Sequence, residues 1–279
     1  MLSIDKISTS TNLLCFKRGG RKEMVSSIPL IASYGYKNID INFCEMLNPT
    51  HRVDNAYIGQ LKSLKKSLGL NYNQSHVPYI PDYLNADQNE RNRIDDLIKR
   101  AFEYSEKLNI DTVVIHPIKG SIEDNINYFE RVLKDFPSSC RLAIENMERY
   151  DEIGRATELI QIIDSLNNSN VGICLDTGHA HMYGLDIPSE IKAMGKYLIG
   201  THIADNHQKY DEHFMPFFGS INWEEVIKAL NEIDYNGYLT YEIMFFFKYL
   251  PEDIQEDVGR LSYKILTKLI SFSQTNNSF

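Results

Sequence analysis

The 279-residue chain contains 43% apolar and 24% charged residues, a globular composition that excludes a disordered, collagen-like or coiled-coil protein. Its 29 basic and 38 acidic side chains give a net charge of −9 at pH 7. An acidic chain repels the phosphate backbone unless a basic patch overrides the average, so the charge disfavours a nucleic-acid-binding protein.

Short apolar segments alternate with longer segments of helical periodicity along the chain. The predicted strands cover residues 7–11, 37–43, 71–76, 112–116, 141–146, 171–176, 197–203 and 238–244. The predicted helices cover residues 25–34, 58–68, 93–108, 122–136, 156–166, 190–196, 223–233 and 254–272. Strict alternation of strand and helix predicts a parallel sheet.

A closed barrel is the simplest way to arrange these segments. The sequence VGICLD at 171–176 is apolar on both faces, as expected of a strand that is buried on both sides. A doubly wound open sheet is the alternative, but no GxGxxG motif follows the first strand. We therefore expect residues 1–279 to form a single (β/α)8 TIM-barrel domain, for which the length is suitable.

The sequence also bears on location and on thiol chemistry. The N-terminal segment lacks a basic region followed by a long apolar core, and no segment has the ~18 apolar residues that a membrane span needs. The four cysteines are far apart and form no CxxC pair, which argues against a thiolate zinc cluster or a disulfide framework. We expect a cytoplasmic protein that has no membrane contact.

Metal-ligand side chains occur at the carboxyl ends of the predicted strands, which meet at one end of a (β/α)8 barrel. The residues at or just beyond these ends are His76, His116, Glu145, Asp176, His179, His202, Asp211, His213 and Glu242. Carboxylates and imidazoles crowded together are costly to bury unless a cation compensates them. Oxygen and imidazole ligands without thiolate suit Mn²⁺, Zn²⁺, Co²⁺, Mg²⁺ or Fe²⁺.

These candidate residues divide into two sets. We predict that Glu145, Asp176, His202 and Glu242 bind a divalent metal. His76, His116, His179, Asp211 and His213 are possible additional ligands, or residues that contact the substrate or support the ligands. His76, His116 and His179, together with Phe246, are the predicted substrate contacts.

Four motifs resemble the xylose isomerase-like TIM barrels. They are LAIEN with Glu145, CLDTGH with Asp176 and His179, GTHIADN with His202 and Asp205, and LTYE with Glu242. The resemblance extends over essentially the whole chain. That superfamily joins sugar isomerases and epimerases with class II apurinic endonucleases (AP endonuclease family 2), and its motifs are less specific for the reaction than for the fold.

In the epimerase branch, the resemblance implies one metal held by residues matching Glu145, Asp176, His202 and Glu242. The two glutamates then transfer protons on opposite faces of the sugar, and His179 matches a residue that contacts a substrate hydroxyl. This is chemically reasonable, because a metal that chelates a hydroxyl and a carbonyl acidifies the adjacent C–H and stabilises the enediolate.

In the endonuclease branch, the resemblance implies three zinc ions held by residues matching all nine candidates, and this sequence has a suitable residue type at each position. The loops after the strands carry few basic residues, which argues against DNA. They are aromatic instead, and they line a pocket or an interface between copies in a homo-oligomer. The aromatic residues are Tyr79, Tyr83, Phe214, Phe217, Phe218, Phe245, Phe246 and Phe247.

The sequence therefore predicts a metal-dependent sugar or sugar phosphate isomerase or epimerase that acts through an enediolate on a small carbohydrate. Glu145 and Glu242 are the predicted catalytic residues. One divalent ion is expected, and up to three are possible. The alternative is a multi-zinc phosphodiesterase. A non-catalytic metal or carbohydrate binder is a third hypothesis, and the complete pair of carboxylates argues against it.

Overall fold

The computed structural model describes residues 2–14, 22–80, 82–137, 139–149, 152–244, 247 and 250–272. The strands are β1 Ile7–Ser10, β2 Asn38–Asn42, β3 Asn71–His76, β4 Thr112–Ile115, β5 Arg141–Glu145, β6 Val171–Asp176, β7 Leu198–His202 and β8 Leu239–Tyr241. The α-helices are α1 Met24–Ser33, α2 Asn55–Ser67, α3 Gln88–Lys107, α4 Ile122–Val132, α5 Ala156–Leu166, α6 Thr177–Met182, α7 Ile187–Met194, α8 Trp223–Glu232 and α9 Glu252–Phe272. Short 3-10 helices include η3, Phe43–Leu47.

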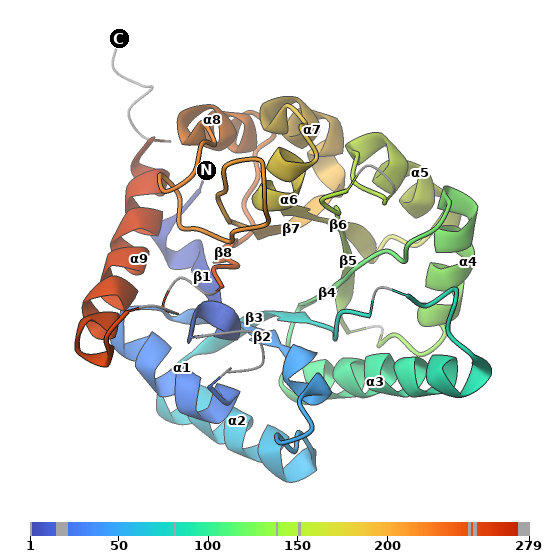
Figure 1. Ribbon diagram of the computed structural model, residues 1–279, viewed down its shortest axis with the longest axis horizontal. Helices are drawn as coiled ribbons and strands as arrows, with labels where there is room; N and C mark the ends of the chain where they lie inside the picture. Colours follow the sequence, from blue (N-terminus) through green and yellow to red (C-terminus); the bar gives the residue numbers. More distant parts are fainter. Residues whose placement is uncertain are drawn as a thin grey trace.

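The eight strands form one parallel sheet in the order β7-β6-β5-β4-β3-β2-β1-β8. Its two edges meet through a parallel bridge between Ile203 and Tyr241, where the Ile203 N–H donates to the Thr240 carbonyl at 2.7 Å. Figure 1 shows this ring of strands inside a ring of helices. The predicted (β/α)8 barrel is therefore confirmed, and the open sheet is wrong.

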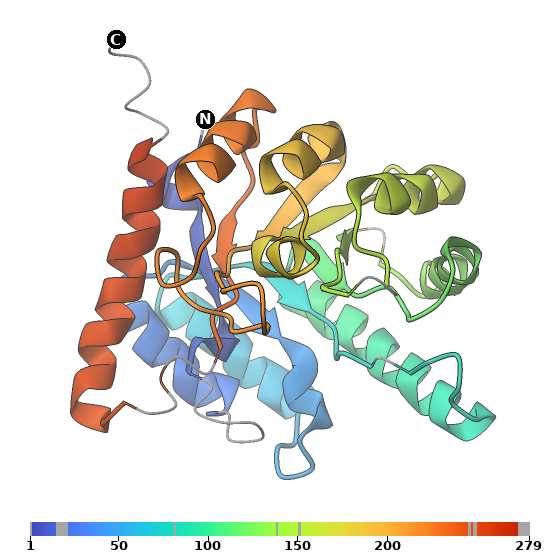
Figure 2. The same cartoon turned by 45° about the horizontal axis from the view of Figure 1, so that its top comes forward.

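The C-terminal helix completes the outer ring. In Figures 1 and 2, α9 lies between α8 and α1, so the last helix of the chain lies beside the first helix. The Tyr263 ring of α9 packs edge-on against Tyr36, with ring centroids 5.2 Å apart. Within the part of the chain that the structure describes, no helix is both long enough and apolar enough to span a membrane.

The predicted elements differ from the observed ones mainly at their ends. Helix α4 ends at Val132 rather than at residue 136, and β8 is shorter than predicted. One helix was missed: α6 begins directly after β6, because the Asp176 carboxylate accepts a hydrogen bond from the His179 N–H at 2.7 Å and so caps it. The segment predicted as a helix over 190–196 belongs to α7, which begins at Ile187.

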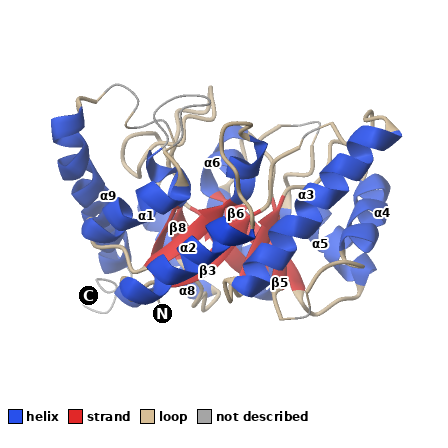
Figure 3. Ribbon diagram, turned by 90° about the horizontal axis from the view of Figure 1, so that it is seen from below, coloured by secondary structure: helices blue, strands red, loops and turns tan. Residues whose placement is uncertain are grey.

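The inside of the barrel is apolar on one side and polar on the other. Val114, Ala143 and Cys174 form a small buried cluster on β4, β5 and β6. On the opposite side, the Ser8 hydroxyl donates to Asn73 at 2.7 Å, so the interior there is polar. Figure 3 shows α6 beyond the strands, at the end of the barrel where the longer loops gather. This is the carboxyl end of the strands, where the candidate residues lie.

Candidate metal centre

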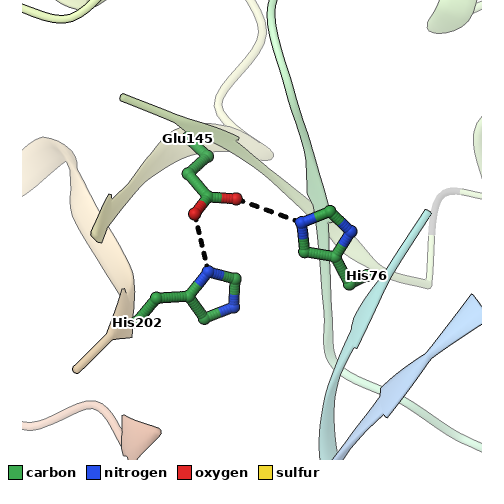
Figure 4. Close-up of side chains that lie close together, drawn as sticks. All are labelled: His76, Glu145 and His202. Carbon is green, nitrogen blue, oxygen red and sulfur yellow. Dashed lines mark hydrogen bonds and ion pairs between the residues drawn. The ribbon is translucent and has the colours of Figure 1, made fainter. Parts of the chain in front are cut away.

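Glu145 lies at the centre of the predicted residues. It is the last residue of β5 and is fully buried. Its Oε2 lies 3.1 Å from His76 Nε2 and 2.9 Å from His116 Nε2, whereas its Oε1 lies 2.8 Å from His202 Nδ1. Figure 4 shows His76 and His202 approaching the two oxygens of this carboxylate from different strands. One carboxylate thus faces two separate groups of imidazoles.

His76, Glu145 and His202 form the first group of possible metal ligands, and a second group shares Glu145 and His202 with it. Ligand atoms of Glu145, Asp176, His202 and Glu242 all lie within 4.8 Å of one another. His202 Nδ1 is 3.4 Å from Glu242 Oε2, and its Nε2 is 2.9 Å from the Gln74 side-chain nitrogen. The four residues end β5, β6 and β7 and follow β8, so the barrel brings together residues from widely separated parts of the sequence.

The third group lies nearer the outside. His179, on α6, and His213, in the loop between β7 and α8, both approach Asp211. His213 Nε2 lies 2.6 Å from Asp211 Oδ2, and His179 Nε2 lies 3.7 Å from the same oxygen. The structure therefore brings all nine predicted residues together at one end of the barrel.

Backbone carbonyls orient three of the histidines. Since a carbonyl oxygen can only accept a hydrogen bond, the nearby Nδ1 must be the donor and Nε2 is directed towards the carboxylates. The Nδ1 atom lies 2.6 Å from the Val77 carbonyl in His76, 2.9 Å from Asn146 in His179 and 2.8 Å from Glu242 in His213. This arrangement is typical of histidines that bind metal ions.

Charge and burial shift the pKa values of these groups in opposite directions. Burial alone would raise the pKa of Glu145, but the surrounding imidazoles, His202 and His116 foremost, hold it well below its ordinary value. Burial raises the pKa of Asp176 to about 7, with the negative charges of Glu145 and Glu242 adding to the effect and His179 opposing it. A positive charge nearby would therefore favour the ionised form of Asp176.

The donor set fits a divalent cation. Asp176 Oδ2 and Asp211 Oδ1 are buried and have no hydrogen-bond partner among the described residues. Leaving buried carboxylate oxygens without a partner is costly, and a bound cation would remove that cost. Imidazole and carboxylate ligands are those preferred by Zn²⁺, Mn²⁺ or Co²⁺, so the residues suit the expected metal.

A cavity of about 620 Å³ opens over the three groups. Among the described residues its lining includes His76, His116, His179, Asp211, His213 and Glu242, together with Asn12, Asn42, Cys44, Glu45, Leu47, Asn48, Pro49, His51, Tyr79, Met147, Glu148 and Met244. No lysine or arginine is in this described lining. The described lining offers hydrogen-bonding side chains such as Asn42 and Asn48 but no positive side chain of fixed charge, which suits a ligand that carries hydroxyl groups better than an anion.

The aromatic residues of the loops do not all line the cavity. Tyr79 lines the cavity and packs edge-on against His116, with centroids 4.7 Å apart. Tyr83 is buried against Tyr128 instead, and Phe217 is 51% exposed. The predicted substrate contact Phe246, like Phe245, lies outside the described residues.

Glu45 and His51 are among the cavity residues that were not identified from the sequence. Both residues lie in the segment after β2, away from the strand ends that carry the nine candidate residues. No periodicity or motif points to them. The nearest signal in the sequence is the alternation of polar Asp40 and Asn42 with apolar residues along β2, and Asn42 does line the cavity.

Comparisons with known proteins agree with this architecture. A family model described as xylose isomerase-like TIM barrel matches residues 28–261. The chain is 24% identical to a D-psicose 3-epimerase of Ruminiclostridium cellulolyticum over 77% of its length and 76% of the relative's. It is also 24% identical to a probable endonuclease 4 of Mycoplasma mycoides, over 66% and 72% of the two chains.

A solved structure has the same fold. The IolI protein, whose structure contains a zinc atom, superimposes with a TM-score of 0.78 at 20% identity, covering 95% of this chain and 98% of that one. At this identity the likeness concerns the fold alone.

Proposed function

Because this chain belongs to the xylose isomerase-like TIM barrel family, a family of enzymes that includes sugar isomerases and epimerases, we propose that it is a divalent-metal-dependent isomerase or epimerase of a small carbohydrate. One observation carries the proposal. Glu145 and Glu242 both approach His202 Nδ1, at 2.8 and 3.4 Å, beneath a cavity whose described lining contains no lysine or arginine.

Each residue has a definite part in this reaction. Glu145, Asp176, His202 and Glu242 would hold the metal, which when bound polarises the substrate carbonyl and lowers the pKa of the adjacent C–H. One of the two glutamates removes that proton and the other returns a proton to the opposite face or to the neighbouring carbon. Return to the opposite face gives epimerisation, and return to the neighbouring carbon gives isomerisation. His179 would contact a substrate hydroxyl.

The similarity to a D-psicose 3-epimerase supports this reaction class, and the zinc atom in the IolI structure supports a metal in this fold. The identity of the sugar is not part of the proposal.

Exchange of solvent deuterium into ketoses tests the proposed reaction. The metal-loaded enzyme is incubated in D₂O with D-psicose and D-fructose, and ¹H NMR follows loss of the proton beside the carbonyl. We expect exchange by the wild type and a loss of at least ~100-fold in Glu145→Gln and in Glu242→Gln, because a general acid or base contributes about 10²–10⁴-fold.

Glu232→Gln is the matched control, since Glu232 pairs with Lys192 on the surface and is remote from the cavity lining. Elemental analysis of each variant separates loss of the proton-transfer group from loss of metal. Near-normal turnover of a ketose to product by metal-loaded Glu242→Gln would contradict the two-carboxylate mechanism.

A three-metal phosphodiesterase is the second candidate, and one specific observation favours it. His179, Asp211 and His213 form a group of their own, while His76 and His116 share the Oε2 side of Glu145. Three bound ions per chain together with nicking of an abasic duplex would support this function. One ion per chain together with deuterium exchange would support the isomerase or epimerase.

A further inference from the structure

The cavity has a second polar wall, formed by β2 and the segment that follows it. Asn42 ends β2, Glu45 lies in η3, and Asn48 and His51 follow in the loop before α2. These side chains line the same cavity as Glu242 and the metal-ligand candidates, but they belong to none of the three groups of possible ligands. The proposed reaction does not use them.

Glu45 is fixed within this wall. Its side chain is 2% exposed, and its Oε1 accepts a hydrogen bond from the Tyr57 hydroxyl at 2.6 Å. Its Oε2 accepts a second from the Met24 N–H at 2.8 Å. The two donors belong to α2 and α1, so the carboxylate is held by the helices behind the cavity. Burial raises the pKa of Glu45 and these two hydrogen bonds oppose that shift, so the carboxylate has a fixed position beside the adjacent loop.

His51 lies beside that carboxylate. Its Nδ1 is 3.4 Å from Glu45 Oε1, and its Nε2 is 4.0 Å from Glu23 Oε1, beyond hydrogen-bond distance. The side chain is only 12% exposed, and Nδ1 is buried without a hydrogen-bond partner among the described residues. A carboxylate on the Nδ1 side favours a proton at that nitrogen, which leaves Nε2 available to a ligand. The pair is therefore suited to hold a ligand rather than to stabilise the fold.

We propose that this wall is a sugar-hydroxyl subsite, in which His51, positioned by Glu45, hydrogen-bonds to a hydroxyl remote from the reacting carbon. The proposal rests on the proposed function and specifies its substrate class. Glu45 and Glu148 put negative charge in a described lining that has no lysine or arginine, so a neutral hydroxyl is favoured over a phosphate. The substrate would be an unphosphorylated ketose that is long enough to reach from the metal-ligand candidates to His51.

Two probes of different length test this assignment. Dihydroxyacetone has the carbonyl and hydroxyl groups needed at the reacting end but no remote hydroxyl, whereas D-psicose has three more carbons. For His51→Ala we expect kcat/KM for deuterium exchange into D-psicose to fall about tenfold or more, mainly through KM, and to stay within about twofold for dihydroxyacetone. A tenfold loss corresponds to one hydrogen bond.

Further variants separate hydrogen bonding from structural damage. His51→Gln, which keeps a polar group at this position, should recover part of the lost KM. His207→Ala is the matched control, because His207 also pairs with a glutamate, Glu212, but is 52% exposed and is not in the described cavity lining. Urea unfolding midpoints show whether each variant folds as the wild type does.

An equal effect of His51→Ala on both probes, or no effect on either, would overturn the subsite. If the wild type exchanges deuterium into neither probe, the proposed reaction fails for these two sugars, and the subsite is tested by calorimetric titration of D-psicose. Weaker binding to His51→Ala than to wild type then supports the subsite, and equal binding or absence of binding to both rejects it.

Discussion

The protonation state of each side chain at this site depends on its neighbours. Glu145 remains ionised although it is buried, because three imidazoles surround its oxygens at 2.8 to 3.1 Å. The pKa of Asp176, by contrast, is raised by burial, and the neighbouring carboxylates of Glu145 and Glu242 add to that shift. The pKa values of these neighbouring carboxylates thus shift in opposite directions because their immediate partners differ.

The Asp211–His213 pair leads to a prediction about pH. Burial would lower the pKa of His213, but Asp211 raises it from 6.5 to about 9, and the imidazoles of His213 and His179 hold the pKa of Asp211 below its ordinary value. A base whose folded pKa is raised stabilises the protein fully below its unfolded pKa, and this contribution is lost as pH rises through the folded pKa. The pair should therefore stabilise metal-free protein at pH 5–6.5 and lose this effect by about pH 9.

Urea unfolding of chelator-treated wild type and Asp211→Asn across pH 5–10 measures this contribution. We expect the difference in free energy of unfolding to be largest near pH 6 and to decrease between pH 6.5 and 9. Glu232→Gln, which breaks an exposed ion pair, should show little difference at any of these pH values. A difference that grows towards pH 9 would contradict the assigned charges.

At the scale of elements, the loop between β7 and α8 is organised by one buried carboxylate. Asp205 accepts hydrogen bonds from the N–H groups of Asn206, Phe217 and Ile221 at 2.9, 3.1 and 3.2 Å. It also accepts one from the Trp223 indole at 2.9 Å. These bonds connect the two ends of the loop that carries Asp211 and His213. The third group of candidate ligands therefore depends on a residue that is not itself among them.

We predict that Asp205→Asn selectively weakens metal binding by His179, Asp211 and His213. The amide nitrogen of asparagine cannot accept the hydrogen bonds that one carboxylate oxygen now receives, so the loop loses its anchor. If the wild type binds more than one ion per chain, elemental analysis of Asp205→Asn after dialysis should show fewer ions, while binding at Glu145, Asp176, His202 and Glu242 persists.

Asp186→Asn is the control for that measurement. Asp186 caps α7 by accepting from the Ser189 N–H at 3.1 Å, and asparagine serves equally well as a cap. Unchanged stoichiometry in Asp205→Asn, with the wild type binding more than one ion, would show that the loop is held by other contacts.

For the whole molecule, closure of the barrel depends on a short seam between β7 and β8. Beside the bridge of Ile203 and Tyr241, the buried Thr201 hydroxyl donates to the Tyr238 carbonyl at 2.8 Å and accepts from the Thr240 N–H at 3.3 Å. A side chain thus satisfies backbone groups where the ladder of main-chain hydrogen bonds is short. Closure keeps Glu242, just beyond β8, beside His202 at the end of β7.

We predict that Thr201→Val lowers the free energy of unfolding by about 1–3 kcal/mol, because the buried Thr240 N–H loses its hydroxyl partner while the shape of the side chain is retained. The Tyr238 carbonyl loses one donor but keeps the Tyr235 hydroxyl at 3.0 Å. Urea unfolding followed by fluorescence of Trp223, which is the sole tryptophan of the sequence, measures the change. Thr201→Ser keeps the hydroxyl and should be less destabilised than Thr201→Val. A valine variant as stable as the wild type would show that the seam does not need this side chain.

The sequence by itself determined the barrel and the nine candidate ligands. Alternating strands and helices specify a parallel sheet, and parallel strands bring their carboxyl ends to one edge. Residues as distant as His76 and Glu242 could therefore be assigned to the same end without knowledge of any loop. Their types alone, carboxylates and imidazoles at strand ends, indicated a cation site.

Only the tertiary structure decided how those residues are grouped and what surrounds them. The division of imidazoles between the two oxygens of Glu145 depends on side-chain directions, which spacing along the chain does not specify. The positions of α6, of the Asp205 loop and of Glu45 depend on hydrogen bonds between side chains and backbone that follow no sequence period. Loop conformation is set by such contacts, whereas strand and helix positions follow from repeating apolar patterns.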